Sequence, residues 1–497
     1  MAQATPGDTP AGAGGGFVRA ITLTDATMLV AGSMIGSGIF IVSADIGRTV
    51  GTPFLLLASW FTAGVITLLG ALVYGELAAM YPRPGGQYVF LHESLGPLTG
   101  FLYGWTLFTV IQTGTIAAVA VAFGRFAGVL WPGVTPERYG WLPHVDLSTP
   151  GGLIQMGLSP QRLVALGSIG VLTWINLRGV REGKTVQTTL TLVKTAALAG
   201  LILLGLTVAL DARAVAANFG GGGFFAPHAL PASLVTAFGA ALVGSLFASD
   251  AWHDVAFAAA EVREPRRNLP RALLYGTGLV CLLYLLTNVS YLCILPLSGT
   301  EGAPTVLERG IQHAAEDRVG SAAGEAMFGP TGGAVMAVVI LIATFGCNNG
   351  LILAGARVIY AMACDGLFFA RAAGRLNSRG VPGVALVLQG LWAGLLCLTG
   401  TYGQLLDYVV FAALVFYVMT TLGLFVLRWR QPGALRPYRV VGYPVLPALY
   451  MLLAGGVAVI LLLAPKTQAQ ALSGLVLVLL GIPVYLLQRR LGRSRVS

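Results

Sequence analysis

Long apolar runs alternate with short polar stretches along almost the whole chain. Because the hydrocarbon core of a bilayer is about 30 Å thick, a helix needs about 20 mostly apolar residues to cross it. The runs are rich in Leu and Ala and lack the two-residue alternation of outer-membrane barrels, so they indicate helices rather than strands. The pattern predicts twelve spans, with approximate bounds 24–46, 53–80, 97–130, 161–178, 185–210, 232–258, 271–296, 331–363, 382–399, 404–427, 443–464 and 470–488.

The composition agrees with this pattern. Of the 497 residues, 56% are hydrophobic and 10% are charged, and the mean hydropathy is +0.79. An average soluble domain carries about 25% charged residues. We therefore expect an all-α integral membrane protein with 12 transmembrane helices.

The distribution of Lys and Arg predicts the orientation of the chain. If the N-terminus is cytoplasmic and twelve spans follow, the inside segments hold twenty of these residues and the outside segments eight. Cytoplasmic loops are normally the richer ones, so both termini are expected to be cytoplasmic. The net charge of +10 then reflects topology and contact with anionic membrane lipids, and it predicts no nucleic-acid partner.

Familiar catalytic and metal-binding motifs do not fit this sequence. The stretch "GVREGKT", Gly179 to Thr185, has one residue too few between its glycines for a phosphate-binding loop. The cysteines fall in or beside predicted spans without CxxC spacing, which favours buried apolar residues over disulfides or a zinc site: Cys281, Cys293, Cys347, Cys364 and Cys397. We expect no enzyme, no catalytic residue, no cofactor and no metal.

Two of the predicted spans carry polar interruptions. The first contains "GSMIGSG", Gly32 to Gly38, although glycine costs about 1 kcal/mol relative to alanine inside a helix. The sixth contains "GSLFASDAWHDVAF", Gly244 to Phe257, and each aspartate costs about 2.5 to 3.5 kcal/mol if left at a helix centre. Broken helices are tolerated at bilayer depth only where the freed backbone faces protein or a watery cavity. The alternative for the first stretch is a small-residue face that lets another helix approach closely.

Interruptions five spans apart indicate inverted repeats of five helices, with half-helix ends that meet near the middle of the membrane. The positive N-terminal end of a half-helix can bind a carboxylate, and freed carbonyls or C-terminal ends can bind an ammonium group. Those two poles match the two charges of an amino acid, which we predict as the small-molecule substrate. Gly38→Val is accordingly expected to abolish binding in a protein that still folds.

Several long motifs in order resemble the amino acid, polyamine and organocation transporter superfamily, and within it the L-type amino acid transporters and their bacterial relatives. The similarity covers about residues 20–430. Its motifs are "GSMIGSGIF", "VYGELAAMYPRPGGQYVFLHESLGPLTGFLYGW", "INLRGVREGKTVQTTLTLVK", "AAEVREPRRNLPRAL" and "FGCNNGLILAGARVIYAMACDGLFFARAAGRLNSRGVP".

The resemblance implies a LeuT-type fold, in which spans 1 to 5 and 6 to 10 form the inverted repeats and two further helices sit outside. The expected organisation is a disordered cytoplasmic tail (1–20), a first repeat (21–215), a second repeat (216–430), helices 11 and 12 (431–490) and a cytoplasmic C-terminal tail (491–497). It also implies a bacterial-type inner (plasma) membrane protein that works by alternating access.

The resemblance further implies a substrate site at the two interruptions. Amides around Ser37, Gly38 and Ile39 would hold the carboxylate, and Phe247 matches the aromatic lid. The stretch "FASDAW" departs from relatives that have tyrosine followed by Asp-Gly-Trp or Gly-Gly-Trp, which leaves substrate preference open. The expected substrate-binding residues are Met34, Ile35, Ser37, Gly38, Ile39, Gln112, Phe247, Ala248, Ser249, Ala251 and Asn349, and the expected coupling or gating residues are Lys194, Phe247, Asp250 and Trp252.

Lys194 lies about ten residues inside the fifth span, too deep to reach the interface easily. An ionisable residue inside a membrane is functional by default, and the alternative is an ion pair with Asp250, Asp254 or another buried acid. In the resembling family the matching lysine occupies the place of sodium and can bridge the first, fifth and eighth helices. We therefore expect sodium-independent transport.

Other polar residues have less specific interpretations. For Gln112, Asn348 and Asn349 an interhelical hydrogen bond is the alternative to substrate contact. Glu76 is expected to be a hinge or gate contact, and Glu261 is expected to form an ion network with Arg263 and Arg266.

Two functional classes stay open. The first is a secondary transporter of amino acids, either an exchanger of neutral amino acids or a proton-coupled importer that uses Asp250 or Asp254. The second is a sensor or channel-like protein on the same fold. A membrane enzyme is disfavoured because no His, Cys or carboxylate cluster has catalytic spacing. Eukaryotic light chains of the resembling family carry a cysteine in the loop between spans three and four, but residues 131–160 contain none. No heavy-chain subunit is therefore expected.

Overall fold

The computed structural model describes residues 17, 19–134, 144–149, 152–225, 234–368, 370–398, 402–465 and 467–493. Within these ranges nine helical segments are long and apolar enough to cross a membrane, and three shorter helices occupy the remaining predicted spans. The all-helical membrane fold predicted from the apolar runs is thus confirmed. Most of the predicted N-terminal tail lies outside the described residues, and the last helix continues to Arg493, inside the predicted C-terminal tail.

The first five spans match the predicted runs closely. They are α1 (Leu23–Met34) with α2 (Gly38–Val50), α3 (Pro53–Met80), α5 (Pro97–Thr106) with the π-helical turn η1 (Leu107–Ile111) and α6 (Gln112–Leu130), α7 (Pro160–Leu177), and α8 (Val180–Thr207). Two short helices lie between or after them, α4 (Gln87–Leu95) and α9 (Ala212–Phe219). The sequence did not predict the antiparallel hairpin of β1 (His144–Thr149) and β2 (Gly152–Gly157) between α6 and α7.

The second half begins with α10 (Leu234–Ala248), followed by the 3-10 turns η2 (Asp254–Ala256) and η3 (Ala259–Glu261). The other elements are α11 (Pro265–Ile294), α12 (Val306–Arg309), η4 (Ala315–Asp317), α13 (Val319–Cys364), α14 (Ala370–Ala373), α15 (Gly383–Cys397), α16 (Tyr402–Arg430), α17 (Val445–Leu463) and α18 (Gln468–Arg493). A kink at Phe328 and Gly329 divides the 46-residue α13. The eighth predicted span starts just after this kink.

Local signals explain where several spans begin. The Thr22 side chain accepts a hydrogen bond from the Asp25 amide, and the Asp25 carboxylate accepts one from the Thr22 amide, which is a capping box. Thr52 and Ser159 each cap a helix whose first residue is proline. Proline is favoured there because the first helical amide has no intrahelical partner in any case.

The contacts between helices follow a repeating scheme. α1 packs against α11 and α8, and α10 packs against α3 and α16. In the same way α8 packs against α13 and α16 against α6, while α7 packs against α6 and α15 against α13. Each of these contacts made by one of the first five spans therefore has a counterpart five spans later.

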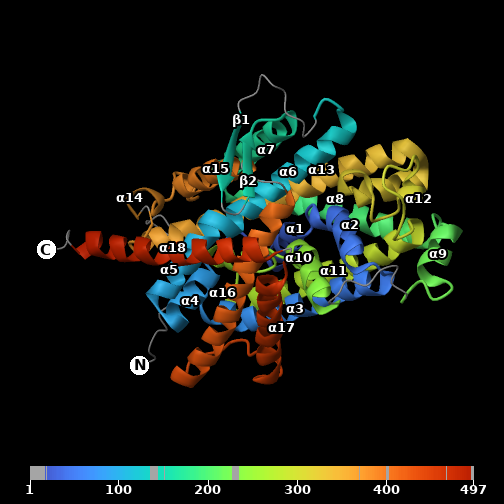
Figure 1. Cartoon of the computed structure of the whole chain (residues 1–497). Helices are drawn as coiled ribbons and strands as arrows, with labels where there is room; N and C mark the ends of the chain where they lie inside the picture. The colour runs from blue at the N-terminus through green and yellow to red at the C-terminus, as the bar shows by residue number, and fades with distance from the viewer. Residues whose placement is uncertain are drawn as a thin grey trace.

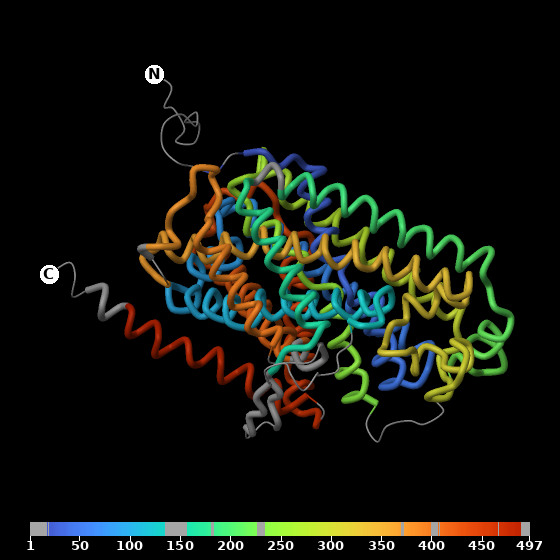
Figure 2. The backbone as a smooth tube through the Cα atoms, turned by 90° about the horizontal axis from the view of Figure 1, so that it is seen from above, coloured from blue at the N-terminus to red at the C-terminus, as the bar shows by residue number. Residues whose placement is uncertain are grey.

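α17 and α18 lie outside this arrangement. In the first span 89% of the most apolar window is buried, whereas the value is 28% for both α17 and α18. Figure 1 shows α18 along the outside of the bundle, and Figure 2 shows it at the periphery, while α8 and α13 run side by side. The core that holds the two interruptions is therefore built from the first ten spans.

Buried ion pairs connect helices near the ends of the bundle. Arg357 on α13 donates to both Glu261 oxygens, at 2.9 and 3.2 Å, and both side chains are at most 2% exposed. The expected network of Glu261 with Arg263 and Arg266 is therefore wrong, because its partner comes from another helix. A second pair joins α3 and α16, where Arg428 donates to both oxygens of Glu76, at 3.0 and 2.6 Å.

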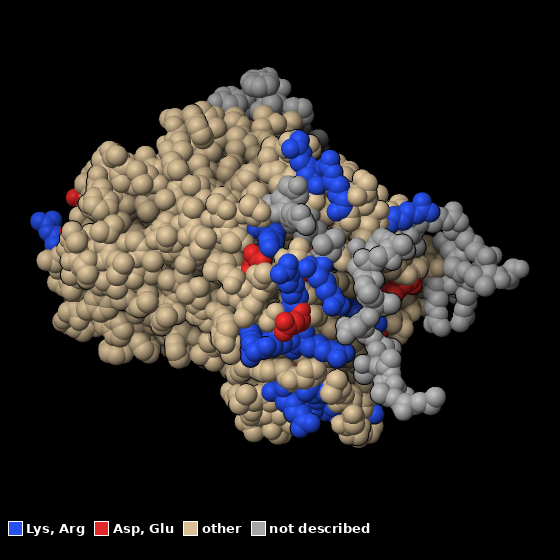
Figure 3. All heavy atoms as spheres, turned by 180° about the vertical axis from the view of Figure 1, so that it is seen from behind, with Lys and Arg blue, Asp and Glu red and all other residues tan. Residues whose placement is uncertain are grey.

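The contacts of Glu76 join helices at the end of the second span. Arg436 lies 3.3 Å from the same carboxylate, and the Val440 amide donates to it at 2.7 Å. Seen from behind, the Lys and Arg side chains gather toward one end of the molecule (Figure 3). Most of the remaining surface in that view carries no charge, as expected for a surface that faces lipid.

We expect Glu261→Gln to destabilise the protein strongly. The substitution leaves the Arg357 guanidinium buried without a counter-charge, which costs about 3 to 5 kcal/mol. The measurement is the thermal unfolding temperature of the purified protein in detergent. Arg267→Gln is the matched control, because its 3.9 Å contact with Glu264 is exposed at both side chains and such pairs contribute about 0 to 1 kcal/mol. Equal shifts for the two variants would contradict the prediction.

Candidate functional site

The first span is broken in the middle. α1 ends at Met34, α2 begins at Gly38, and residues 35–37 are not helical. The last carbonyls of α1 and the first amides of α2 therefore lose helical partners at membrane depth. The helix is interrupted at the "GSMIGSG" stretch, and its glycines also allow close packing: a Cβ on Gly32 would lie 2.2 Å from the Gln187 Nε2 atom.

Lys194 binds the end of α1. Its Nζ atom, on a side chain that is 1% exposed, donates to the carbonyl oxygens of Gly32 at 2.5 Å and Ile35 at 2.7 Å. A longer contact of 3.4 Å reaches the Ala343 carbonyl on α13. The ammonium group thus joins α1, α8 and α13. Within the described residues Lys194 donates its hydrogen bonds to carbonyl oxygens. The alternative interpretation, a buried ion pair with an aspartate, is therefore not found there.

Two further side chains bind the carbonyls between those that Lys194 uses. The Tyr284 hydroxyl on α11 donates to the Met34 carbonyl at 2.7 Å. The Cys347 thiol on α13 donates to the Ser33 carbonyl at 2.9 Å. Four consecutive carbonyls at the end of α1 are therefore satisfied by protein. Each carbonyl oxygen has a second lone pair, so an additional ammonium ligand is chemically possible at Met34 and Ile35.

The second interruption follows α10. This helix ends at Ala248, and the chain continues through non-helical residues to the two 3-10 turns. Ala251 has φ +64°, in the left-handed region that favours glycine. A residue with a side chain loses about 1 to 2 kcal/mol there, so the backbone at this position of the "FASDAW" motif is strained.

The two interruptions touch each other. A Cβ placed on Gly38 would lie 2.5 Å from the Ala248 Cβ and 2.8 Å from its Cα. Gly38 is therefore also a packing residue, and a valine there requires α2 and α10 to move apart, so the expectation that Gly38→Val still folds stays a prediction. The described site is closed to solvent, because every expected substrate-binding residue is buried: Met34, Ile35, Ser37, Gly38, Ile39, Gln112, Phe247, Ala248, Ser249, Ala251 and Asn349.

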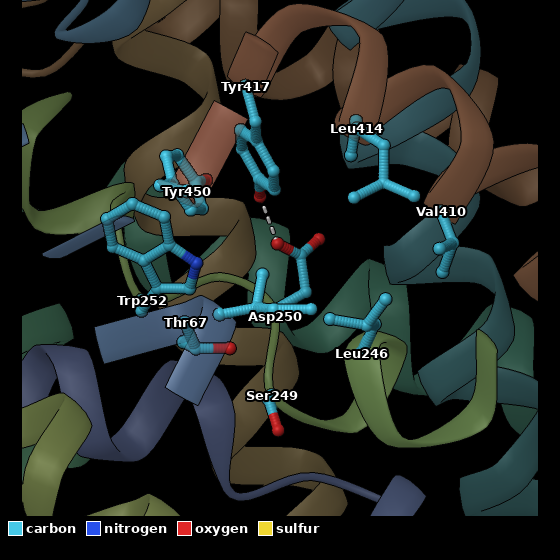
Figure 4. A pocket seen from close by; sticks show the side chains of 11 residues that line it. Thr67, Leu246, Ser249, Asp250, Trp252, Val410, Leu414, Tyr417 and Tyr450 are labelled. Carbon is cyan, nitrogen blue, oxygen red and sulfur yellow. Dashed lines mark hydrogen bonds between the residues drawn. The ribbon is translucent and has the colours of Figure 1, made fainter. Parts of the chain in front are cut away.

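A small cavity lies beside the second interruption. It is lined by Thr67 and Ile66 of α3, by Ser249, Asp250 and Trp252, and by residues of α16 and α17. The cavity offers about 20 Å³ to the centres of water molecules, which is room for about one water. Figure 4 shows the Asp250 carboxylate pointing toward Tyr417 of α16, whose hydroxyl donates to it, with Trp252 and Tyr450 on one side.

A buried chain of polar groups continues from this carboxylate. The Tyr417 hydroxyl lies 3.3 Å from the His253 Nδ1 atom, and the His253 Nε2 atom lies 4.0 Å from an Asp254 oxygen. Gln112 donates to the other Asp254 oxygen at 3.2 Å and to the Leu351 carbonyl at 2.9 Å. Gln112 follows the π-helical turn η1, a type of turn that is frequent at functional sites. The chain links α16, the second interruption, α6 and α13.

The asparagines of the eighth span connect helices. Asn349 accepts a hydrogen bond from Asn176 on α7 at 2.9 Å and donates to the Gln187 side chain on α8 at 3.1 Å. Asn348 donates to the Ile116 carbonyl at 3.2 Å. These contacts are interhelical hydrogen bonds, which is the alternative interpretation of these residues. They join Asn349 of α13 to α7 and α8.

Trp252, an expected gating residue, packs instead of pointing into solvent. Its ring lies 4.7 Å from the Tyr74 ring in an edge-on arrangement, and it is 2% exposed. Sequence reasoning missed Tyr284, Tyr417 and Cys347 as partners of the interruptions. A tyrosine or cysteine in an apolar span carries no local signal of its hydrogen-bond partner, so only its membrane depth relative to the interruptions points to such a role.

Comparisons with known proteins find similar sequences along almost the whole chain. The family model described as "Amino acid permease" matches residues 21–485. The chain is 30% identical to the serine/threonine exchanger SteT of Bacillus subtilis, over 95% of this chain and 97% of that protein. It is also 30% identical to the large neutral amino acids transporter small subunit 2 of Homo sapiens, over 96% and 82%. The b(0,+)-type amino acid transporter 1 of Rattus norvegicus is 28% identical, over 91% and 84%.

The contact between Gly38 and Ala248 gives a test of the closed site. Gly38→Ala should force α2 and α10 apart and cost about 1 to 3 kcal/mol, seen as a lower unfolding temperature. Adding Ala248→Gly removes the opposing Cβ and should restore most of the loss. Gly456→Ala is the control, because a Cβ there meets nothing within 4 Å. A Gly38→Ala protein as stable as the control would show that the two interruptions do not touch.

Proposed function

Because the chain belongs to the amino acid permease family, we propose that it exchanges neutral L-amino acids across a membrane without sodium. One observation carries the sodium-independent part. The Lys194 ammonium already occupies the carbonyls of Gly32 and Ile35, and freed carbonyls of this kind coordinate sodium in coupled transporters. The relatives whose printed names specify exchange or neutral amino acids support the substrate class.

The substrate is proposed to bind between the two interruptions. The N-terminal end of α2 presents the amides of Gly38 and Ile39 to the carboxylate, because the first amides of a helix lack intrahelical partners and carry its positive dipole end. The second lone pairs of the Met34 and Ile35 carbonyls face the ammonium group. Since Ala248 lies against Gly38, substrate entry requires α10 to move away from α2.

The repeating scheme of helix contacts supports two five-helix repeats, residues 21–215 and 216–430, with helices 11 and 12 in 431–490. The contact of α1 with α11 corresponds to that of α10 with α3, and the contact of α8 with α13 to that of α16 with α6. Inverted repeats of this kind alternate access by rocking one bundle against another around a fixed site.

We place both termini in the cytoplasm and the protein in a bacterial-type plasma membrane. The excess of Lys and Arg in the segments that share a side with the N-terminus supports this orientation. We also propose that the chain works without a heavy-chain subunit, since residues 131–160 contain no cysteine for a disulfide link. The bilayer lipids are then its immediate environment.

A second candidate function is proton-coupled import. The chain of buried polar groups from Asp250 through Tyr417, His253 and Asp254 to Gln112 favours it, because the two carboxyls have no Lys or Arg partner among the described residues. A chain of this kind can pass or hold a proton between α16 and α6. The two candidates differ in whether transport needs an internal amino acid.

Uptake by sodium-free proteoliposomes separates the two functions. Labelled serine, threonine and leucine are supplied outside, with or without unlabelled amino acid inside, at equal pH and then with an imposed proton gradient. An exchanger takes up label only against internal amino acid, which is the expected result. Uptake into empty vesicles that rises with the gradient would overturn exchange in favour of proton-coupled import. No uptake under either condition would leave the sensor class as the better reading.

Lys194→Met tests the built-in cation. The substitution keeps the length of the side chain but removes charged hydrogen bonds that are each worth about 1.5 to 3 kcal/mol, so exchange should slow about 10- to 100-fold. Substrate affinity, measured by scintillation proximity binding, should change much less. Thr195→Val is the control, because its buried hydroxyl makes no hydrogen bond in the described structure. Full exchange by Lys194→Met would refute the role of the lysine.

A further inference from the structure

A hollow runs along the lipid-facing surface between α7 and α15. One part, of about 480 Å³, is lined by apolar side chains and glycines that include Leu166, Gly170, Leu391 and Gly394. A second part, of about 620 Å³, is lined by residues at the ends of both helices and in the loop before α15. Leu177 and Val387 line both parts, so the two form one continuous groove.

Small residues create this groove. A Cβ on Gly390 would lie 2.8 Å from the Thr173 hydroxyl, and one on Gly394 would lie 3.2 Å from Leu166. α7 and α15 therefore cross closely at these glycines. At Gly170 a Cβ would meet nothing within 4 Å, so no side chain fills the space beside the crossing. An empty space of this size would forfeit the dispersion contacts of its walls, and a lipid chain is the apolar material at hand in a bilayer.

Basic side chains lie at one end of the groove. Arg178 follows the last residue of α7, and its guanidinium carbon lies 3.6 Å from the centre of the Trp174 ring, which lines the groove. Arg375 lines the second part. Both arginines are exposed, and within the described residues neither forms an ion pair with a carboxylate. Unpaired guanidinium groups beside an apolar groove complement an anionic phosphate with an attached acyl chain.

A polar group lies at the depth where a phospholipid has its ester groups. Thr173 is five residues before Arg178, a rise of about 7.5 Å along a helix, and the interfacial layer of a bilayer leaflet is about 5 to 8 Å thick. The Thr173 residue is 9% exposed and lines the groove, while its hydroxyl oxygen is buried beside Gly390 and has no hydrogen-bond partner in the described structure. A helical threonine usually bonds to the carbonyl four residues earlier. Because this hydroxyl makes no such bond, a change of rotamer that brings it to an acceptor in the groove breaks no hydrogen bond.

We propose that the groove between α7 and α15 binds one anionic phospholipid. The phosphate contacts Arg178 and Arg375, the Thr173 hydroxyl turns into the groove and donates to an ester oxygen, and one acyl chain lies along Gly170 and Gly394. The bound lipid joins two helices that pack against α6 and α13, which hold Gln112 and Cys347. This site does not depend on the transport mode proposed above.

Native mass spectrometry of the delipidated full-length protein tests this site. Phosphatidylglycerol and phosphatidylcholine with identical acyl chains are titrated separately. We expect one phosphatidylglycerol per chain, bound on the order of 10-fold more tightly than phosphatidylcholine, because each arginine near the surface favours an anionic lipid. Arg178→Gln and Arg375→Gln should each reduce this preference. Gly170→Leu should weaken the binding of both lipids, because the leucine side chain fills the groove.

Two matched variants control for general effects, and each is checked for folding by size-exclusion chromatography. Arg430→Gln removes an exposed arginine on α16, and Gly456→Leu adds a side chain where a Cβ on α17 meets nothing within 4 Å. Both should bind phosphatidylglycerol like the unmodified protein. Equal affinity for the two lipids, or an Arg430→Gln loss as large as that of Arg178→Gln, would overturn the proposal. The proposal would also be overturned if the lipid-free protein formed a dimer that Gly170→Leu dissociates, because a second copy of the chain would then occupy the groove.

Discussion

A carbonyl group freed inside a bilayer has to find another donor, because no water is available to it in the hydrocarbon. The break after Met34 frees the end of α1, and the donors that satisfy it come from three other helices. Lys194 reaches from α8, Tyr284 from α11 and Cys347 from α13. These helices must therefore converge on one short stretch of backbone. The convergence holds the first span in place even though it is interrupted, and it puts the amino group of Lys194 beside the interruption.

Close packing of the two interruptions gives the core its closed form. Gly38 and Ala248 approach so closely that Gly38 does not tolerate a larger side chain without movement. The same contact that stabilises this state therefore fills the space in which we propose that an amino acid binds. A transporter that alternates its access needs such a contact to be breakable, and a contact between a glycine and an alanine buries little apolar area, so its loss is modest.

Charge is distributed in a way that suits a membrane. Buried pairs such as Glu261 with Arg357 join helices near the ends of the bundle, where an unpaired charge would be costly. The polar chain from Asp250 to Gln112 lies inside the core, and its hydrogen bonds compensate the loss of water. The outer surface is largely uncharged apart from the basic end (Figure 3). The groove between α7 and α15 has exposed arginines at one end, so it combines an apolar surface with positive charge. A phospholipid supplies the matching acyl chain and phosphate.

The sequence by itself determined the membrane fold, the spans and the two interruptions. A bilayer allows few solutions for a long apolar run, and the glycines of the first span and the aspartates of the sixth break the apolar pattern locally. The depth of Lys194 was also readable, because depth follows from its position within a run. Only the tertiary structure decided the partners. Glu261 pairs with Arg357 across 96 residues, and Gly38 meets Ala248 across an even longer separation. Such pairings depend on how helices cross in space, and no periodicity within one span encodes which helix lies opposite.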